Sequence, residues 1–220
     1  MKFRRKAEPT QAPDESVPSA DGETTAATGD ATAAPAAPTG SGPFDESEVA
    51  GDGVERVDLG SLLVAPTPGR ELRLQVDEPT GTVQAVMLAG PDGALEFQAF
   101  AAPRNGDLWS TVRPQIAADI ARRGGTTTER EGRVGTELVC QVPVKRPDGT
   151  PATQPSRIIG INGDRWMLRA SLLGRPALEP EGATEWEDAL SQVVVRRGTT
   201  AMPVGEPLPV VLPEQARRVN

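Results

Sequence analysis

Three carboxylates, Glu185, Glu187 and Asp188, form the densest acidic group in the part of the sequence that is able to fold. Neighbouring carboxylates can bind Mg²⁺ or exchange protons with a substrate. The three also follow Thr184 directly, and negative charge in the first turn of a helix is stabilising. A structural role therefore explains them sufficiently, and a weak metal-dependent hydrolase stays open as a third hypothesis.

The residues and motifs that other common catalytic sites require are missing from the sequence. It has no histidine and no tyrosine, which excludes Ser-His and Cys-His nucleophile pairs and imidazole metal sites. It contains neither the GxxxxGK[ST] nor the GxGxxG phosphate-binding pattern. The single cysteine, Cys140 in "LVCQV", reads as a small core residue. The sequence favours a non-catalytic protein without a cofactor or a metal.

Positive charge gathers in one stretch of the chain. Residues 104–175 hold 12 basic and 7 acidic residues, and together these arginines could form a basic face for phosphate or nucleic acid: Arg122, Arg123, Arg130, Arg133 and Arg157. Acidic residues interleave with them, and only Trp109 and Trp166 are available to stack on bases. We therefore expect an interaction or accessory module that binds a protein partner, with a nucleotide- or nucleic-acid-associated factor as the alternative.

The first 52 residues differ from the rest of the chain. Residues 1–52 are rich in Ala, Pro, Thr and Gly, and they hold 4 basic against 10 acidic residues. Such a segment buries too little apolar area to offset the entropy of ordering it, so we predict a disordered acidic arm. The arm could lie across the basic stretch and screen it. A lone cysteine, no secretory signal and no span of about 20 apolar residues favour a cytoplasmic protein.

Residues 53–200 predict a single α+β domain. Alternating apolar and polar residues indicate strands, and turn signals at Pro91-Asp92-Gly93 and Asn162-Gly163 indicate two hairpins. Residues 145–155 read as a Pro-rich loop. Hairpins without βαβ alternation favour a mostly antiparallel sheet flanked by two main helices. Residues 201–220 form a Pro-rich extended tail that either packs on the domain or hangs free.

The two helices are expected in similar stretches, "LWSTVRPQIAADIARRGGTT" from Leu108 and "EWEDALSQVVVRRGTT" from Glu185. Each combines a tryptophan, an apolar stripe, an Arg-Arg pair and a glycine. Asp107 and Thr184 are predicted N-caps, and Pro114 predicts a kink or a late start of the first helix. We attribute the similarity to helix construction and expect both tryptophans to seal a helix against the sheet.

Several blocks between Gly42 and Pro203 resemble an actinobacterial family of unknown function, DUF3710. They are "GPFD", "RVDLGSLLVAP", "FQAFAAPRNGDLW", "RRGG" and "GDRWMLRASLLGRPA". The resemblance implies no activity, cofactor or catalytic residue. More loosely, the order of strands and helices is similar to Mog1/PsbP-like domains, which are mostly binding or accessory modules. Neither resemblance specifies the partner or the oligomeric state.

Overall fold

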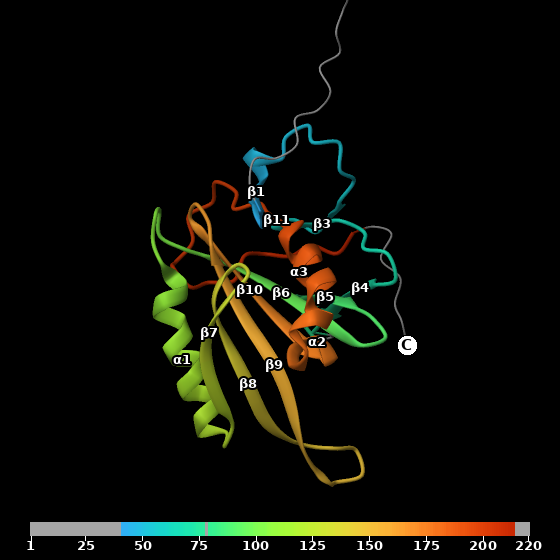
Figure 1. Ribbon diagram of the computed structural model, residues 1–220. Helices are drawn as coiled ribbons and strands as arrows, with labels where there is room; N and C mark the ends of the chain where they lie inside the picture. Colours follow the sequence, from blue (N-terminus) through green and yellow to red (C-terminus); the bar gives the residue numbers. More distant parts are fainter. Residues whose placement is uncertain (1–40, 78, 214–220) are drawn as a thin grey trace, which may run out of the picture. The chain divides into compact units, whose positions relative to one another are not determined.

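The computed structural model describes residues 41–77 and 79–213 (Figure 1). Short 3₁₀ helices, labelled η, occur beside the α-helices and strands. In chain order the elements are β1 (Phe44–Asp45), η1 (Glu46–Glu48), β2 (Val57–Asp58), β3 (Leu62–Val64), β4 (Glu71–Val76), β5 (Val83–Ala89), β6 (Gly93–Ala101), α1 (Leu108–Arg122), β7 (Thr126–Gly132), β8 (Gly135–Lys145), β9 (Pro151–Asn162), β10 (Trp166–Gly174), α2 (Arg175–Leu178), η2 (Pro180–Ala183), α3 (Thr184–Ser191) and β11 (Val194–Val195).

The strands form two sheets, and the predicted α+β class is confirmed. The larger sheet has seven strands in the order β4-β5-β6-β10-β9-β8-β7, with every neighbouring pair antiparallel. Four short strands form the smaller sheet in the order β1-β11-β3-β2, in which β1 and β11 are parallel. No helix in residues 41–77 and 79–213 is both long and apolar enough to cross a membrane.

Both hairpins predicted from turn residues are present. The turn after Gly90 joins β5 to β6, and the Asn162-Gly163 turn joins β9 to β10. Residues 145–155 differ from the prediction, because β8 extends to Lys145 and β9 begins at Pro151. Pro151 and Pro155 lie in β9, which pairs with β8, and only residues 146–150, with Pro147, form the turn.

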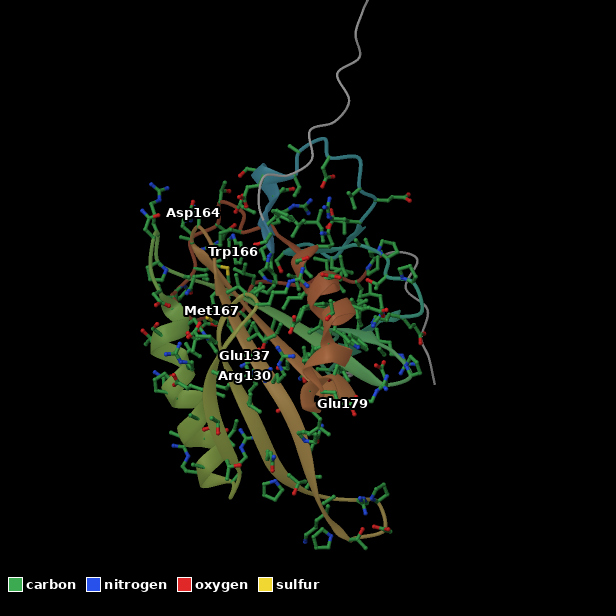
Figure 2. The ribbon with its side chains drawn as sticks, in the orientation of Figure 1. Arg130, Glu137, Asp164, Trp166, Met167 and Glu179 are labelled. Atoms are coloured by element: carbon green, nitrogen blue, oxygen red, sulfur yellow. The ribbon has the colours of Figure 1, made fainter. Side chains whose placement is uncertain are left out.

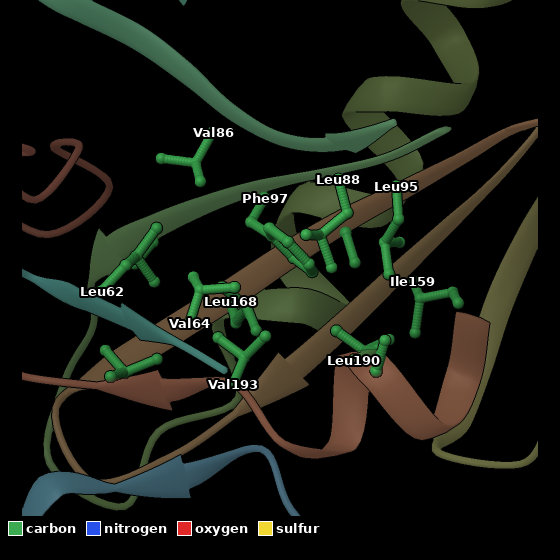
Figure 3. Close-up of a cluster of buried hydrophobic side chains, with 14 of the residues drawn as sticks. Leu62, Val64, Val86, Leu88, Leu95, Phe97, Ile159, Leu168, Leu190 and Val193 are labelled. Carbon is green, nitrogen blue, oxygen red and sulfur yellow. The ribbon is translucent and has the colours of Figure 1, made fainter. Parts of the chain in front are cut away.

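The main core lies between the seven-stranded sheet on one side and the four-stranded sheet with α3 on the other. Alternate residues of β5, β6, β9 and β10 point into it, as the two-residue period of a strand requires. Figure 3 shows Leu88, Phe97 and Leu168 of the larger sheet meeting Val64 of β3 and Leu190 of α3. Because these side chains are almost fully buried, the small sheet and α3 are held to the large sheet by aliphatic packing.

Helix α1 packs on the opposite face of the large sheet, against β7, β8 and β9. Its N-cap is Asp107, as predicted, with Oδ1 accepting a hydrogen bond of 2.9 Å from the Ser110 backbone N–H. Gly124, with φ of 79°, ends the helix in the left-handed conformation. Pro114 lies inside the helix, which begins at Leu108, so the predicted late start does not occur.

The second predicted helix is shorter than expected. Helix α3 ends at Ser191, and after a gap of two residues Val194 and Val195 form β11, between β1 and β3. Thr184 is its first helical residue and makes no side-chain capping bond, so the predicted N-cap is wrong. The second Arg-Arg-Gly therefore follows a strand, whereas the first follows a helix. Trp109 and Trp186 are both buried in first turns, where we expected them to pack.

The ends of the described chain are part of the fold. Residues 1–40 of the predicted arm lie outside the described residues, but its last part forms β1 and η1 and buries Phe44 and Val49. The folded part therefore begins before residue 53. At the other end, the tail joins the two sheets, because the Leu208 N–H donates to Ala99 O at 2.8 Å and the Val211 N–H donates to Leu59 O at 2.9 Å.

Candidate functional site

The arginines of the predicted basic face divide between two places. Arg122 and Arg123 are exposed at the C-terminal end of α1, and both pair with Asp119 of the same helix. In the first of these pairs, Arg122 Nη2 lies 3.0 Å from Asp119 Oδ1. Neither arginine shares a carboxylate with the other members of the predicted face.

Arg130 and Arg157 belong instead to an ion-pair cluster with Glu137 and Glu187. Arg157 Nη2 lies 2.8 Å from Glu137 Oε2 and 2.6 Å from Glu187 Oε1, and Arg130 pairs with Glu137 from the neighbouring strand. Figure 2 labels Arg130 and Glu137 where β7 and β8 run side by side. Burial alone lowers the pKa of Arg157, but its bonds to Glu137 and Glu187 raise that pKa above its ordinary value. The cluster joins α3 to the large sheet.

The fifth arginine of the predicted basic face, Arg133, also has an acidic partner. Its Nη1 lies 2.5 Å from Asp188 Oδ1 on α3. Each arginine of the predicted basic face thus has a carboxylate partner. An anion that bound there would compete with these carboxylates for the guanidinium groups. The five arginines of the predicted basic face are therefore neutralised locally, Arg122 and Arg123 by their own helix and the other three by neighbouring parts of the fold.

The acidic group of α3 is also divided among separate partners. Glu185 pairs with Arg70, whereas Glu187 and Asp188 pair with the two different arginines described above. Within residues 41–77 and 79–213, no group of three or more acidic, Cys or His side chains has the geometry to hold a metal ion. The cysteine is equally unsuited to nucleophilic chemistry, because burial raises the pKa of the Cys140 thiol to about 11.

A hollow of about 420 Å³ lies between η1 and the β9–β10 turn. Its carboxylates come from Asp45, Glu48 and Asp164, and Figure 2 labels Asp164 and Trp166 at its border. Two of these carboxylates have local partners: Asp45 Oδ2 accepts from Trp166 Nε1 at 3.1 Å, and Glu48 Oε2 accepts from the Asp45 N–H at 2.6 Å. The bond between Asp45 and Trp166 thus holds the N-cap of η1 against the hairpin beside this hollow.

A smaller, apolar slot of about 130 Å³ lies between the two sheets. Apolar side chains line it from β2, β3, β4, β5 and the loop after β3: Val57, Val64, Ala65, Pro66, Leu72 and Leu88. An apolar cavity of about 150 Å³ is large enough to hold benzene. The slot therefore has room for one branched aliphatic side chain.

Arg70 is the charged residue that lines the apolar slot. Its side chain is only 10% exposed, and its guanidinium carbon lies 4.0 Å from the centre of the Trp186 ring. Nη2 donates to Glu185 Oε2 at 3.1 Å, whereas Nε is buried without a hydrogen-bond partner in the described structure. A basic group beside an apolar slot can bind a ligand that is both apolar and anionic.

The strand that follows Arg70, β4, is the outermost strand of the seven-stranded sheet. Leu72 and Leu74 face the core, whereas Glu71 and Arg73 are exposed and pair with each other at 2.7 Å. At the opposite border of the sheet, β7 contacts α1 through an ion pair of 3.1 Å between Glu129 and Arg113. The border at β4 has no such helix among the described residues.

Sequence reasoning did not identify Arg70 or the apolar slot. The pattern "RELRLQV" predicts a strand, and the prediction is confirmed, but an alternating pattern does not indicate whether a strand lies at the border or the centre of a sheet. The slot needs β2, β3, β4 and β5 to come together, and Arg70 needs Trp186 more than a hundred positions later in the chain. No local signal carries that information.

Comparison with known proteins assigns the chain to a family without assigning it an activity. A crystal structure of a protein from Bacteroides thetaiotaomicron VPI-5482 is similar over 68% of this chain, with a TM-score of 0.40 and 11% identity. The chain spans about half of that protein, 50% of its length. Among curated proteins there is no match. The family model described as a protein of unknown function, DUF3710, matches residues 42–219, and the chain therefore belongs to this family.

Proposed function

We propose that the protein is a non-catalytic interaction module that binds an extended segment of a protein partner along β4. The observation that carries this proposal is the position of the apolar slot directly beside the outermost strand of the large sheet. An outermost strand presents backbone N–H and C=O groups that an incoming strand can pair with. In this mode of recognition, main-chain hydrogen bonds supply affinity and pockets for alternate side chains supply specificity.

The balance of charge supports a protein partner over nucleic acid. Nucleic-acid binding depends on Lys and Arg side chains that neutralise phosphates and release counterions. Here the arginines of the basic face already pair with Asp119, Glu137, Glu187 and Asp188. The nucleotide- or nucleic-acid-associated alternative would rely chiefly on Arg122 and Arg123, the most exposed of the set.

Filling the apolar slot tests the proposal. Ala65→Phe places an aromatic ring in the slot, and Ala50→Phe, at an exposed position outside it, is the matched control. Each tagged variant is used for affinity purification from the native lysate, with and without nuclease, and the retained proteins are quantified by mass spectrometry. We expect a nuclease-resistant partner that the unmodified chain and Ala50→Phe retain and Ala65→Phe loses.

Two results would contradict the proposal. Retention of the same partner by a folded Ala65→Phe variant would show that the slot is not the binding site. Loss of all retained proteins on nuclease treatment would instead favour the nucleic-acid alternative, and charge reversal at Arg122 and Arg123 should then weaken binding and flatten its salt dependence.

A further inference from the structure

We propose that Arg70 and the apolar slot together recognise a free carboxyl terminus, so that the bound segment is the C-terminal end of the partner and ends in an aliphatic residue. The last side chain occupies the slot, and the terminal carboxylate accepts hydrogen bonds from the Arg70 guanidinium. This inference rests on the proposed function, because it specifies which kind of segment pairs with β4.

The hydrogen bonding of Arg70 is incomplete among the described residues. A guanidinium has five N–H donors in a fixed plane, and a carboxylate can accept two of them side by side. Nε of Arg70 is buried and has no partner among the described residues, and the whole side chain is only 10% exposed. Buried donors are nearly always paired in folded proteins. An acceptor that reaches Nε from the slot would satisfy this donor.

The present partner of Arg70 is easily replaced by another carboxylate. Glu185 accepts from Nη2 at 3.1 Å, but its own side chain is 81% exposed. Ion pairs with a solvated member contribute little to stability, so Glu185 can rotate into water when another carboxylate arrives. Glu185 therefore occupies the place of the ligand carboxylate and competes weakly with it.

The guanidinium itself is held in position. It lies over the Trp186 ring at 4.0 Å, and Trp186 is fully buried in the core. Gly90 lets the ring approach β5, because a Cβ atom at Gly90 would lie 3.1 Å from two atoms of the Trp186 ring. A cation fixed over an aromatic face loses little conformational freedom when it binds a carboxylate.

The order of residues also sets the direction of the bound segment. Arg70 directly precedes β4, so a terminal carboxylate at Arg70 lies at the N-terminal end of that strand. The segment then runs antiparallel to β4, and its last side chain points toward Leu72 and Leu88 at the slot. With about 130 Å³ available, Val, Leu or Ile fits better than Trp.

The test compares peptides that differ only in their terminal group. The probes are fluorescein-labelled pentapeptides of sequence Thr-Gln-Thr-Val-X, with X as Val, Leu or Ile, each prepared as the free acid and as the C-terminal amide. Binding to the full chain is measured by fluorescence anisotropy. We expect at least one free acid to bind about tenfold tighter than its amide, because charge-assisted hydrogen bonds are about twice as strong as neutral ones.

Three variants separate the roles of the residues. Arg70→Gln should lower the affinity for the free acid to that of the amide, while Arg122→Gln, an exposed arginine of α1 on the opposite face of the large sheet, should leave both unchanged. Glu185→Gln removes the competing carboxylate and should strengthen binding of the free acid about two- to fivefold without changing the amide, since an exposed pair contributes this much at most. A gain of affinity cannot result from misfolding.

The outcomes distinguish this inference from the proposed function. Equal binding of acid and amide would overturn recognition of the carboxyl terminus and leave strand pairing at β4 intact. Absence of binding by every acid and every amide would overturn both. Weaker binding of the acid by Glu185→Gln would also overturn the inference, since it would show that Glu185 supports the ligand.

Discussion

Replacing Arg157 by leucine should strongly destabilise the protein. The side chains of Arg157 and Glu137 are 3% and 1% exposed, so Arg157→Leu leaves the Glu137 carboxylate in the interior with only Arg130 beside it. Removing one partner of a buried pair costs about 3–5 kcal/mol. Because Arg130 remains and is 38% exposed, we expect the lower end of that range, about 3 kcal/mol.

Arg133→Leu is the matched control, since Arg133 also pairs with an acidic residue of α3. Its side chain is 48% exposed and that of Asp188 is 57% exposed, and such pairs contribute about 0–1 kcal/mol. Urea unfolding followed by circular dichroism measures both variants. With a urea dependence of about 2 kcal/mol per molar, Arg157→Leu should lower the midpoint by about 1.5 M. Equal midpoints for the two variants would refute the reasoning.

A double variant tests whether the unpaired Glu137 charge causes the destabilisation expected for Arg157→Leu. In Glu137→Leu/Arg157→Leu both buried charges are gone, and replacing a buried pair by apolar residues is often neutral for stability. The partners left behind, Arg130 and Glu187, are both more exposed than the residues removed. The double variant should therefore be more stable than Arg157→Leu alone, and a further loss would show that packing, rather than the unpaired charge, explains the effect.

Two further predictions concern close packing and pH. Gly160→Ala should lower the free energy of unfolding by about 1–3 kcal/mol, because its Cβ would lie 2.1 Å from the Trp109 ring. Gly182→Ala is the control, since its Cβ would lie 3.9 Å from its nearest neighbour. Equal thermal midpoints for the two variants would contradict the close contact. The hydrogen bond from Arg196 lowers the pKa of Asp58. The stability that the Asp58 carboxylate contributes is therefore present above the ordinary aspartate pKa of about 3.9, and it is lost as pH falls through the lower folded-state pKa. Asp58→Asn should therefore reduce the difference in thermal midpoint between about pH 6 and about pH 3, and an unchanged difference would argue against this role.

Local signals in the sequence were sufficient for the two predicted hairpins of the large sheet and for the first helix. The Asn162-Gly163 turn fixes the β9–β10 hairpin because it acts over a few residues, and Asp107 and Gly124 set the two ends of α1 in the same way. Such signals need no partner from a distant part of the chain. The prediction of an α+β protein depended on them alone.

The second Arg-Arg-Gly shows where local signals stop. Val194 and Val195 continue the helical pattern of α3, yet they form β11 because β1 and β3 lie on either side to pair with them. The pairing buries both valines completely, which outweighs a weak local preference for helix. The predicted helix was too long because strand pairing, a tertiary contact, competes with the local preference for helix in these residues.

The candidate site depended on tertiary structure throughout. The sequence by itself determined the number of arginines and carboxylates, but only the fold decided that the predicted basic arginines pair with acidic residues and that Arg70 lies beside an apolar slot. Sequence position says little about which charges meet, because Arg133 in the β7–β8 turn pairs with Asp188 of α3, 55 residues away. Electrostatic and packing interactions depend on distance in space, and that distance is set only when the two sheets and α3 close around one core.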